Sequence, residues 1–425
     1  MNLKRALGPL AEPSFARYFT AVVISNAGSF ASVIALSFAV LAASSPTALG
    51  FIFLAREIPV LALVLVGGVF ADRLPRRFVL AGASFVQGAS QLVAAVILIH
   101  GSANIPALAI CAAVNGAASA FGYPATTGLI PQVVSASRLQ QANALLGLTP
   151  RIIGIAGAAL GAWLINSIGA GYALAFDSVT FIVAGALLVT VAKDAPRIKR
   201  GTSPLADLAE GWREVRSRTW LWTMILSFGV FQLAYFPALT VLGPEIARKH
   251  LGGAPAWASI ITGELIGGII GGAISFKIRF PRPLLLTNIV TIPIIVQLVA
   301  FAMGWPLITL VICAMFTGVG FSIGGTIWFT TLQRVIPSES LSRVSSFDWF
   351  GSLALNPLGY ALVGPLAAVI GERRTMGFAA ALLAAAIFLP LTVPAVVGLR
   401  LPPIETTALS EEESEGNPLG DCGKN

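Results

Sequence analysis

The chain has 425 residues, of which 56% are hydrophobic and only 11% are charged, and its mean hydropathy is +0.84. Soluble globular chains carry about 25% charged residues, so this composition excludes an ordinary soluble protein. The net charge of +8 does not indicate a nucleic-acid partner, because the cationic residues cluster in short segments beside long apolar ones, as in cytoplasmic loops of membrane proteins.

The few Cys and His residues predict neither a disulfide framework nor a metal site. Cys111 and Cys313 lie in apolar segments and Cys422 lies near the C-terminus, a spacing that fits neither pattern. His100 and His250 each stand alone near a loop. We therefore expect no cofactor. The sequence also shows no nucleophile–base constellation and no phosphate-binding loop, so we do not expect an enzyme.

Proline, glycine and charge divide the chain into apolar segments, each long enough to cross a bilayer as a helix of about 20 residues. The twelve expected spans are residues 15–42, 47–71, 77–99, 105–128, 139–165, 172–192, 219–244, 255–276, 283–303, 306–331, 342–369 and 375–398. The predicted fold class is an all-α membrane protein with twelve transmembrane helices. An even number of spans places both termini on one side.

The distribution of Lys and Arg predicts the orientation. If the N-terminus is inside, Arg56 and Arg151 fall within spans, and all but four of the other cationic residues lie on the inner side. The outer side then holds only Arg248, Lys249, Arg373 and Arg374. Because cytoplasmic loops carry the excess of Lys and Arg, we expect both termini in the cytoplasm and the protein in the plasma membrane.

The two halves of the chain repeat each other. A shift of 202 residues aligns Cys111 with Cys313, Gly116 with Gly318, Gly122 with Gly324, Leu139 with Leu341, Gly157 with Gly359 and Gly169 with Gly371. We therefore expect two pseudo-symmetric six-helix halves, residues 1–192 and 219–400, with a solute site between them. Residues 193–218 form a linker whose part from Ser203 to Arg218 has the periodicity of an amphipathic helix. Residues 401–425 are an acidic tail that we expect to be disordered.

A glycine-rich cationic loop connects the second and third spans. It reads Gly67-Gly68-Val69-Phe70-Ala71-Asp72-Arg73-Leu74-Pro75-Arg76-Arg77. This pattern resembles the loop between helices 2 and 3 of the major facilitator superfamily, at the corresponding place in a twelve-span chain. The resemblance implies the major facilitator fold, with the halves alternately opening to either side of the membrane.

Further segments resemble one branch of that superfamily, which includes the enterobactin exporter and macrolide-efflux proteins. They are residues 129–131 and 138–145, the Ser-Pro-Leu start at 203–205 with Gly-Trp at 211–212, and residues 333–337 and 341–344. The branch resemblance implies proton-driven export of amphiphilic compounds. Many drug–proton antiporters carry Arg-x-x-Gln-Gly in helix 4, whereas Ala112 and Asn115 occupy the Arg and Gln positions here.

The resemblance assigns an inner gate to the loop, formed by Gly68, Asp72, Arg73, Arg76 and Arg77. Asp72 would approach the start of helix 11, where unpaired N–H groups favour an anion. The alternative is that these residues only anchor the loop by charge.

Ionisable residues inside spans are candidates for proton coupling, because burying them is costly. Helices 5 and 8 are neighbours in the family fold, so Arg151 and Glu264 are expected to pair; the alternative is a permanent structural ion pair. Arg56 and Glu57 lie near the middle of the second span. The weaker candidates, nearer span ends, are Asp177 and Asp348.

In the family fold the first, fourth, seventh and tenth spans line the cavity. The substrate-pocket candidates on them are Asn26, Asn115, Tyr123, Gln232, Tyr235 and Trp328. Pro237 and Pro244 are expected to bend the seventh span. The alternative role of the polar residues is to hold helices together.

The sequence therefore predicts a monomeric secondary active transporter that exports an amphiphilic small molecule, such as a drug, siderophore or other secondary metabolite, by proton antiport. Its partners would be that small molecule and membrane lipid. The alternatives are a facilitator or importer of the same fold, or a membrane enzyme or lipid-handling protein.

Overall fold

The computed structural model describes residues 8–101, 103–135, 138–191, 212–275, 281–336 and 338–400. The N-terminal half contains η1 (Gly8–Ala11), α2 (Pro13–Ala43), α3 (Pro46–Arg73), α4 (Arg76–Ile99), α5 (Ile105–Val133), α6 (Leu139–Ser167) and α7 (Ala170–Val189). The C-terminal half contains α9 (Thr219–Pro237), η3 (Ala238–Leu242), α10 (Gly243–Ile246), η4 (Ala247–Leu251), α11 (Ala254–Ser275), α12 (Pro283–Val290), α13 (Ile292–Met303), α14 (Leu307–Val335), α15 (Ser338–Leu353), α16 (Asn356–Ile370), α17 (Glu372–Phe388), η5 (Leu389–Thr392) and α18 (Pro394–Val397).

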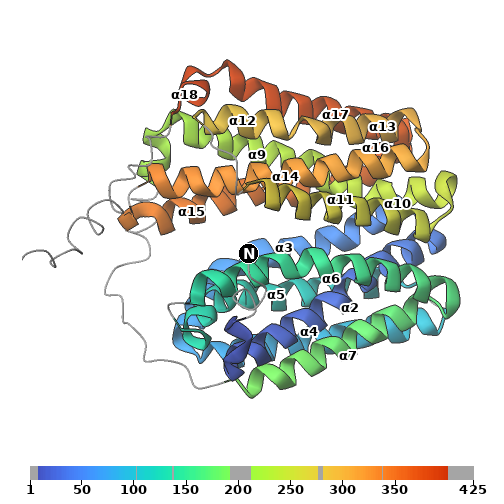
Figure 1. The fold of residues 1–425 in the computed structure, drawn as a ribbon. Coiled ribbons are helices and arrows are strands. Elements are labelled where there is room, and N and C mark those ends of the chain that lie inside the picture. Colours follow the sequence, from blue (N-terminus) through green and yellow to red (C-terminus); the bar gives the residue numbers. More distant parts are fainter. Residues whose placement is uncertain are drawn as a thin grey trace, which may run out of the picture.

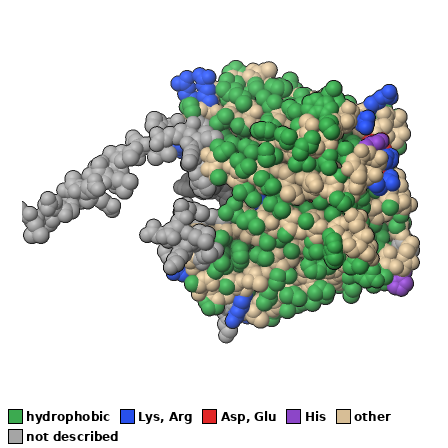
Figure 2. Space-filling model, turned by 45° about the vertical axis from the view of Figure 1, so that its right-hand side comes forward, with side chains coloured by type: hydrophobic (Ala, Val, Ile, Leu, Met, Phe, Trp, Pro, Cys, Tyr) green, Lys and Arg blue, Asp and Glu red, His purple; other side chains and the backbone are tan. Residues whose placement is uncertain are grey.

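Within these ranges, twelve helical stretches are long and apolar enough to cross a membrane, which confirms the predicted number of spans and the all-α class. Hydrophobic side chains cover the side of the bundle, and Lys, Arg and His side chains appear only near its two ends (Figure 2). A bilayer of the usual thickness would cover this apolar belt.

The two halves form two adjacent layers of helices (Figure 1). In the first half α3 packs along α5, and α4 packs along α7. The corresponding pairs of the second half pack in the same way, α11 along α14 and α13 along α17. Glycine permits the closest approaches: a Cβ atom at Gly263 of α11 would lie only 2.7 Å from the carbonyl oxygen of Val311 in α14.

Near prolines, three spans differ from the continuous helices expected from the sequence: one is longer and two are broken. The seventh span continues from Thr219 to Leu251 rather than ending at 244, because two π-helical turns, η3 and η4, follow Pro237 and Pro244. The ninth span breaks at Thr291 before Pro293, and the eleventh breaks between α15 and α16 before Pro357.

The halves contact each other through backbone atoms at one end of the bundle, and α6 also packs along α11 nearer its middle. We call the end where α7 stops and α9 starts the linker end, and the end where α2 turns into α3 the far end. At the far end, a Cβ atom at Gly50 would lie 2.6 Å from the carbonyl oxygen of Tyr360, and one at Gly364 would lie 2.6 Å from the Thr47 nitrogen. The halves therefore touch there through backbone atoms of α3 and α16.

Buried apolar residues show the same asymmetry between the two ends. One cluster of described residues joins both halves and includes Leu49 and Tyr235. Two further clusters each stay within one half, around Phe15 in the first and around Trp220 in the second. Both extend toward the linker end, where each half thus keeps a core of its own.

Only part of the predicted linker helix and none of the tail fall within the described residues. Residues 212–217 are helical. Val215 is buried against the second half, and the Trp212 ring lies 5.8 Å from that of Phe347 on α15. This end of the linker therefore packs on the C-terminal half.

Candidate functional site

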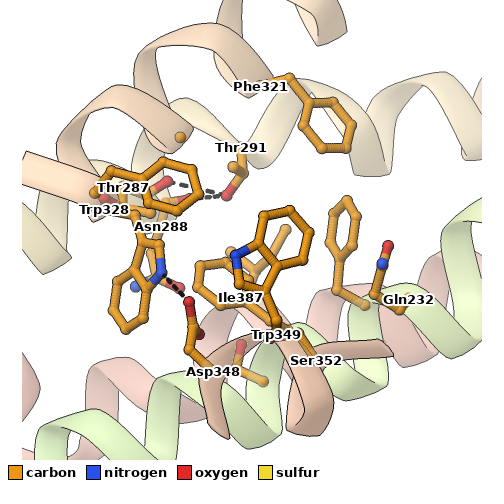
Figure 3. Close-up of a pocket in the computed structure, with 15 residues that line it drawn as sticks. Gln232, Thr287, Asn288, Thr291, Phe321, Trp328, Asp348, Trp349, Ser352 and Ile387 are labelled. Carbon is orange, nitrogen blue, oxygen red and sulfur yellow. Dashed lines mark hydrogen bonds between the residues drawn. The ribbon is translucent and has the colours of Figure 1, made fainter. Parts of the chain in front are cut away.

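A pocket of about 230 Å³ lies entirely within the C-terminal half, among α9, α12, α14, α15 and α17. Figure 3 shows side chains from these helices converging on it. Its lining residues are Ser227, Phe228, Phe231, Gln232, Thr287, Asn288, Thr291, Phe321, Gly325, Trp328, Phe329, Asp348, Trp349, Ser352 and Ile387. Phe329 and Trp349 are 45% and 56% exposed, so they mark where it opens.

Asp348 is the one ionisable side chain among these lining residues. It is 5% exposed. The indole nitrogen of Trp328 donates a hydrogen bond to its Oδ2 atom at 3.0 Å (Figure 3). Its Oδ1 atom is buried and makes no hydrogen bond of normal geometry with any described residue, although the Ser352 hydroxyl lies near the carboxylate. An unsatisfied buried acceptor is costly, so this oxygen is a candidate contact for a ligand.

Aromatic rings surround this carboxylate. The Trp328 ring packs edge-on against Phe228 at 5.0 Å between centroids, and Phe231 packs edge-on against Phe321 at 5.4 Å. Near the opening, the Phe329 and Trp349 rings are 6.3 Å apart. The walls therefore offer large apolar faces around one buried acid.

Two of the predicted pocket residues, Gln232 and Trp328, line this cavity. Tyr235 is fully buried one turn further along α9 and donates to Gln297 Oε1 at 3.2 Å. Asn26 donates to the Val22 carbonyl oxygen of its own helix at 2.7 Å. Asn115 lies on α5 in the other half, and the Tyr123 side chain lies outside the described residues. The structure thus gathers only part of the predicted set.

The expected ion pair between Arg151 and Glu264 is not formed, although their helices, α6 and α11, do pack together. Among the described residues Glu264 has no cationic partner within salt-bridge distance; the Tyr235 hydroxyl lies within hydrogen-bonding reach of its carboxylate instead. The Arg151 guanidinium lies against Gly268, one turn from Glu264 toward the linker end. The two side chains do not pair because Arg151 packs against Gly268, whereas Glu264 lies near the Tyr235 hydroxyl.

Arg56 and Glu57 form an ion pair with each other at 2.6 Å, and both side chains are partly exposed. They lie on α3 near Tyr360 of the other half. The pair therefore sits beside the contact between the halves at the far end.

Asp177 lies near the middle of α7 rather than near a span end, which corrects the expectation from sequence. Its side chain is fully buried. It accepts hydrogen bonds from Ser32 at 2.7 Å and Gln91 at 2.6 Å, with weaker ones from Ser29 and Thr180 at 3.4 Å. These donors were not identified from the sequence. They could have been found as polar residues that lie at similar depths in three different spans.

The predicted gate is only partly described, because the side chains of residues 64–73, which include Gly68, Asp72 and Arg73, lie outside the described set. Arg76 begins α4. Arg77 donates to the Val191 carbonyl oxygen at 2.8 Å, and its guanidinium lies 4.5 Å from the Phe78 ring centroid. Arg77 thus ties the start of α4 to the end of α7 within one half.

Comparison with known proteins identifies the class. Residues 18–354 match the sequence profile of the Major Facilitator Superfamily, and the chain belongs to this family of transporters. It is 26% identical to the multidrug efflux pump Tap of Mycobacterium tuberculosis (strain ATCC 25618 / H37Rv), over 96% of this chain and 98% of that protein. It is 27% identical to the enterobactin exporter EntS of Salmonella typhimurium, over 72% of this chain and 74% of the exporter.

Solved structures show the same fold. A bacterial homologue of the human lysosomal transporter Spinster, in an inward-facing and unoccupied conformation, superposes with a TM-score of 0.70 at 16% identity. The match covers 92% of this chain and all of the other. At this identity the likeness shows the fold alone. The protein is thus a transporter of the superfamily with efflux pumps among its relatives, and not an enzyme.

Proposed function

We propose that this protein exports an amphiphilic small molecule across the plasma membrane by alternating access and proton antiport. The pocket carries the proposal: a mostly apolar, aromatic cavity with a few polar groups is the usual form of a small-molecule site. The efflux pumps among its relatives support the direction of transport. In this proposal the protein works as a monomer with both termini in the cytoplasm.

Contacts between the halves at the far end support alternating access. Backbone contacts at Gly50 and Gly364 hold the halves together there, whereas each half has a separate core toward the linker end. With the linker in the cytoplasm, this arrangement is open inward. Rocking of the halves would then break the far-end contacts and open the site outward.

Glu264 is the residue we propose for proton coupling. Its side chain is half-buried on α11, which packs against α6 of the other half, and it lies near the Tyr235 hydroxyl, which donates to Gln297. Adding a proton would remove its charge at the contact between the halves and would change its interaction with the Tyr235 hydroxyl. Arg151, on the facing helix, is positioned to respond to that charge.

The test is pH-driven accumulation of a substrate dye in proteoliposomes by wild type, Glu264→Gln and Glu57→Gln. Loss of accumulation against a gradient in Glu264→Gln, with downhill exchange retained and Glu57→Gln active, supports the proposal. If Glu264→Gln still accumulates dye, coupling lies elsewhere. If the wild type equilibrates dye but ignores the pH gradient, the protein is a facilitator, and net uptake into cells would make it an importer.

A further inference from the structure

We propose that the pocket at Asp348 binds an organic cation, so that the protein carries amphiphiles with a positively charged head group. The inference names the substrate class of the proposed exporter and rests on that proposed function. It is carried by three features of the described residues: an unpartnered carboxylate oxygen, a surrounding set of aromatic rings, and the absence of any basic side chain from the lining.

The Asp348 oxygen without a hydrogen bond makes the pocket suited to a positively charged ligand. Oδ1 of Asp348 is buried without a hydrogen-bond partner in the described part of the chain, while Oδ2 is satisfied by Trp328. A buried carboxylate is stable only when charge or hydrogen bonds compensate it, or when it takes up a proton. A cationic ligand supplies the compensation that the protein leaves out.

The aromatic walls favour the same sign of charge. The face of an aromatic ring is negative and attracts a cation within about 6 Å of its centroid. Trp328, Phe228 and Phe231 line the pocket, and Trp349 stands near its opening. An anion would meet both the carboxylate and these ring faces, so the pocket should reject anionic amphiphiles.

The basic residues described on the surrounding helices lie outside the lining, and the side chain of Arg343 on α15 is outside the described set. Arg218 precedes α9 and Arg282 precedes α12, so both stand at the helix starts on the linker end. Arg334 is in the last turn of α14, more than one turn beyond Trp328. On α17 the basic residues are Arg373 and Arg374, at the far end. None of these cations lines the pocket.

The size of the pocket limits which part of a substrate enters it. Its volume of about 230 Å³ is below the roughly 300–1,000 Å³ typical of sites that enclose a drug-sized ligand. We therefore expect it to hold the cationic head and one ring. The remaining apolar body would lie outside, beyond Phe329 and Trp349.

The probe pair for the test is benzyltrimethylammonium, a permanent cation, and neopentylbenzene, in which carbon replaces the nitrogen. Both are titrated against the full-length protein in lipid nanodiscs by tryptophan fluorescence, with empty nanodiscs to correct for partition into lipid. The cation should bind at least tenfold more tightly than its isostere. Asp348→Asn should raise the Kd of the cation at least tenfold and that of the isostere less than twofold, and Asp348→Glu should keep the preference.

Equal affinities for the two probes in the wild type, or an equal loss of both in Asp348→Asn, would overturn the inference. If Asp348→Asn does not fold, Trp349→Leu replaces it. Its loss of one ring face should lower the cation-to-isostere preference about two- to fivefold, and an unchanged preference would again overturn the inference.

Export assays separate this inference from the proposed function. Inverted vesicles are loaded by a pH gradient with ethidium, a cation, or with a neutral dye. Export of the neutral dye alone, together with equal probe affinities, would leave the proposed exporter intact and remove the cation site. Binding that depends on Asp348 without export of either dye would keep the site and remove the proposed function.

Discussion

The two halves of this transporter each bury an aspartate within the membrane-spanning bundle, and they treat it in opposite ways. Asp177 in the first half receives hydrogen bonds from side chains of α2, α4 and α7. Asp348 in the second half receives one from Trp328 and keeps one oxygen unpartnered beside a pocket. The first arrangement holds helices together, and the second leaves a charge available to a ligand.

The duplication makes this difference instructive. With the shift of 202 residues, Trp328, Asp348 and Trp349 correspond to Thr126, Leu146 and Gly147. Conversely, Asp177 corresponds to Ala379. Neither acid has a counterpart, so the two halves differ at both positions. The same six-helix arrangement therefore holds a structural acid in one half and a candidate binding acid in the other.

Removing each acid in turn tests most directly whether Asp177 is structural and Asp348 is not. Asp177→Leu leaves Gln91 and Ser32 without their acceptor in a fully buried site. Each orphaned donor costs on the order of 1–3 kcal/mol, so we expect a large fall in the thermal unfolding midpoint in detergent. Asp348→Leu should have a smaller effect, because the hydrogen bond from Trp328 and a weaker interaction with Ser352 are lost while a buried oxygen without a hydrogen bond is removed. Equal falls would show that Asp348 is as structural as Asp177.

Filling the pocket should weaken substrate binding strongly without unfolding the protein. Gly325 lines the pocket, and a Cβ atom there would meet no other atom within 4 Å. Gly325→Leu is expected to weaken substrate binding at least tenfold, while helix propensity offers a gain of about 1 kcal/mol. The control is Gly82→Leu on α4, where a Cβ atom likewise meets nothing within 4 Å. Unaltered binding by Gly325→Leu would place the substrate elsewhere.

A bulky residue at the far end should separate the halves. Gly364→Val would drive side-chain atoms into the Thr47 backbone, so we expect transport to fall severalfold and a cysteine at Ser44 to react faster with an impermeant thiol reagent. Gly377→Val is the matched control, since a Cβ atom there lies 3.7 Å from Ala302 Cβ within the same half. Unchanged labelling would argue against closure at this end.

The loop acid of the first half should have a smaller effect. In this loop a shift of 204 residues aligns Gly67 and Gly68 with Gly271 and Gly272, and Arg73 with Lys277. Asp72 then aligns with Phe276, so only the first loop carries an acid at this position. If Asp72 closes the inner gate, Asp72→Asn should lower export about two- to fivefold at equal membrane expression, and Lys277→Gln should change it less. Full export by Asp72→Asn would leave the loop only an anchoring role.

The fold could be predicted from the sequence because bilayer thickness fixes the length of a span and loop chemistry marks its ends. The length of the seventh span could not, because the span was expected to end at Pro244, yet a π-helical turn carries the helix on to Leu251. Such turns depend on packing around them, which periodicity does not report.

Individual site residues could be predicted as polar groups in apolar spans, but their partners could not. Arg151 and Glu264 lie on facing helices, as expected, yet differ by one turn in height and do not pair. Trp328 and Gln232 were recognised, whereas the pocket between them depends on rotations of five helices. Residue spacing within each helix does not show that the two side chains lie one turn apart along the helix axis.

A pocket built by one half alone has a thermodynamic consequence for direction. If the C-terminal half moves as a rigid body, the surroundings of a head group bound there are unchanged by rocking, and its affinity is the same from either side of the membrane. A ligand with equal affinity for both states does not shift their balance. Binding of such a substrate does not favour either state. The free energy for transport against a gradient must therefore come from groups whose contacts differ between the two states.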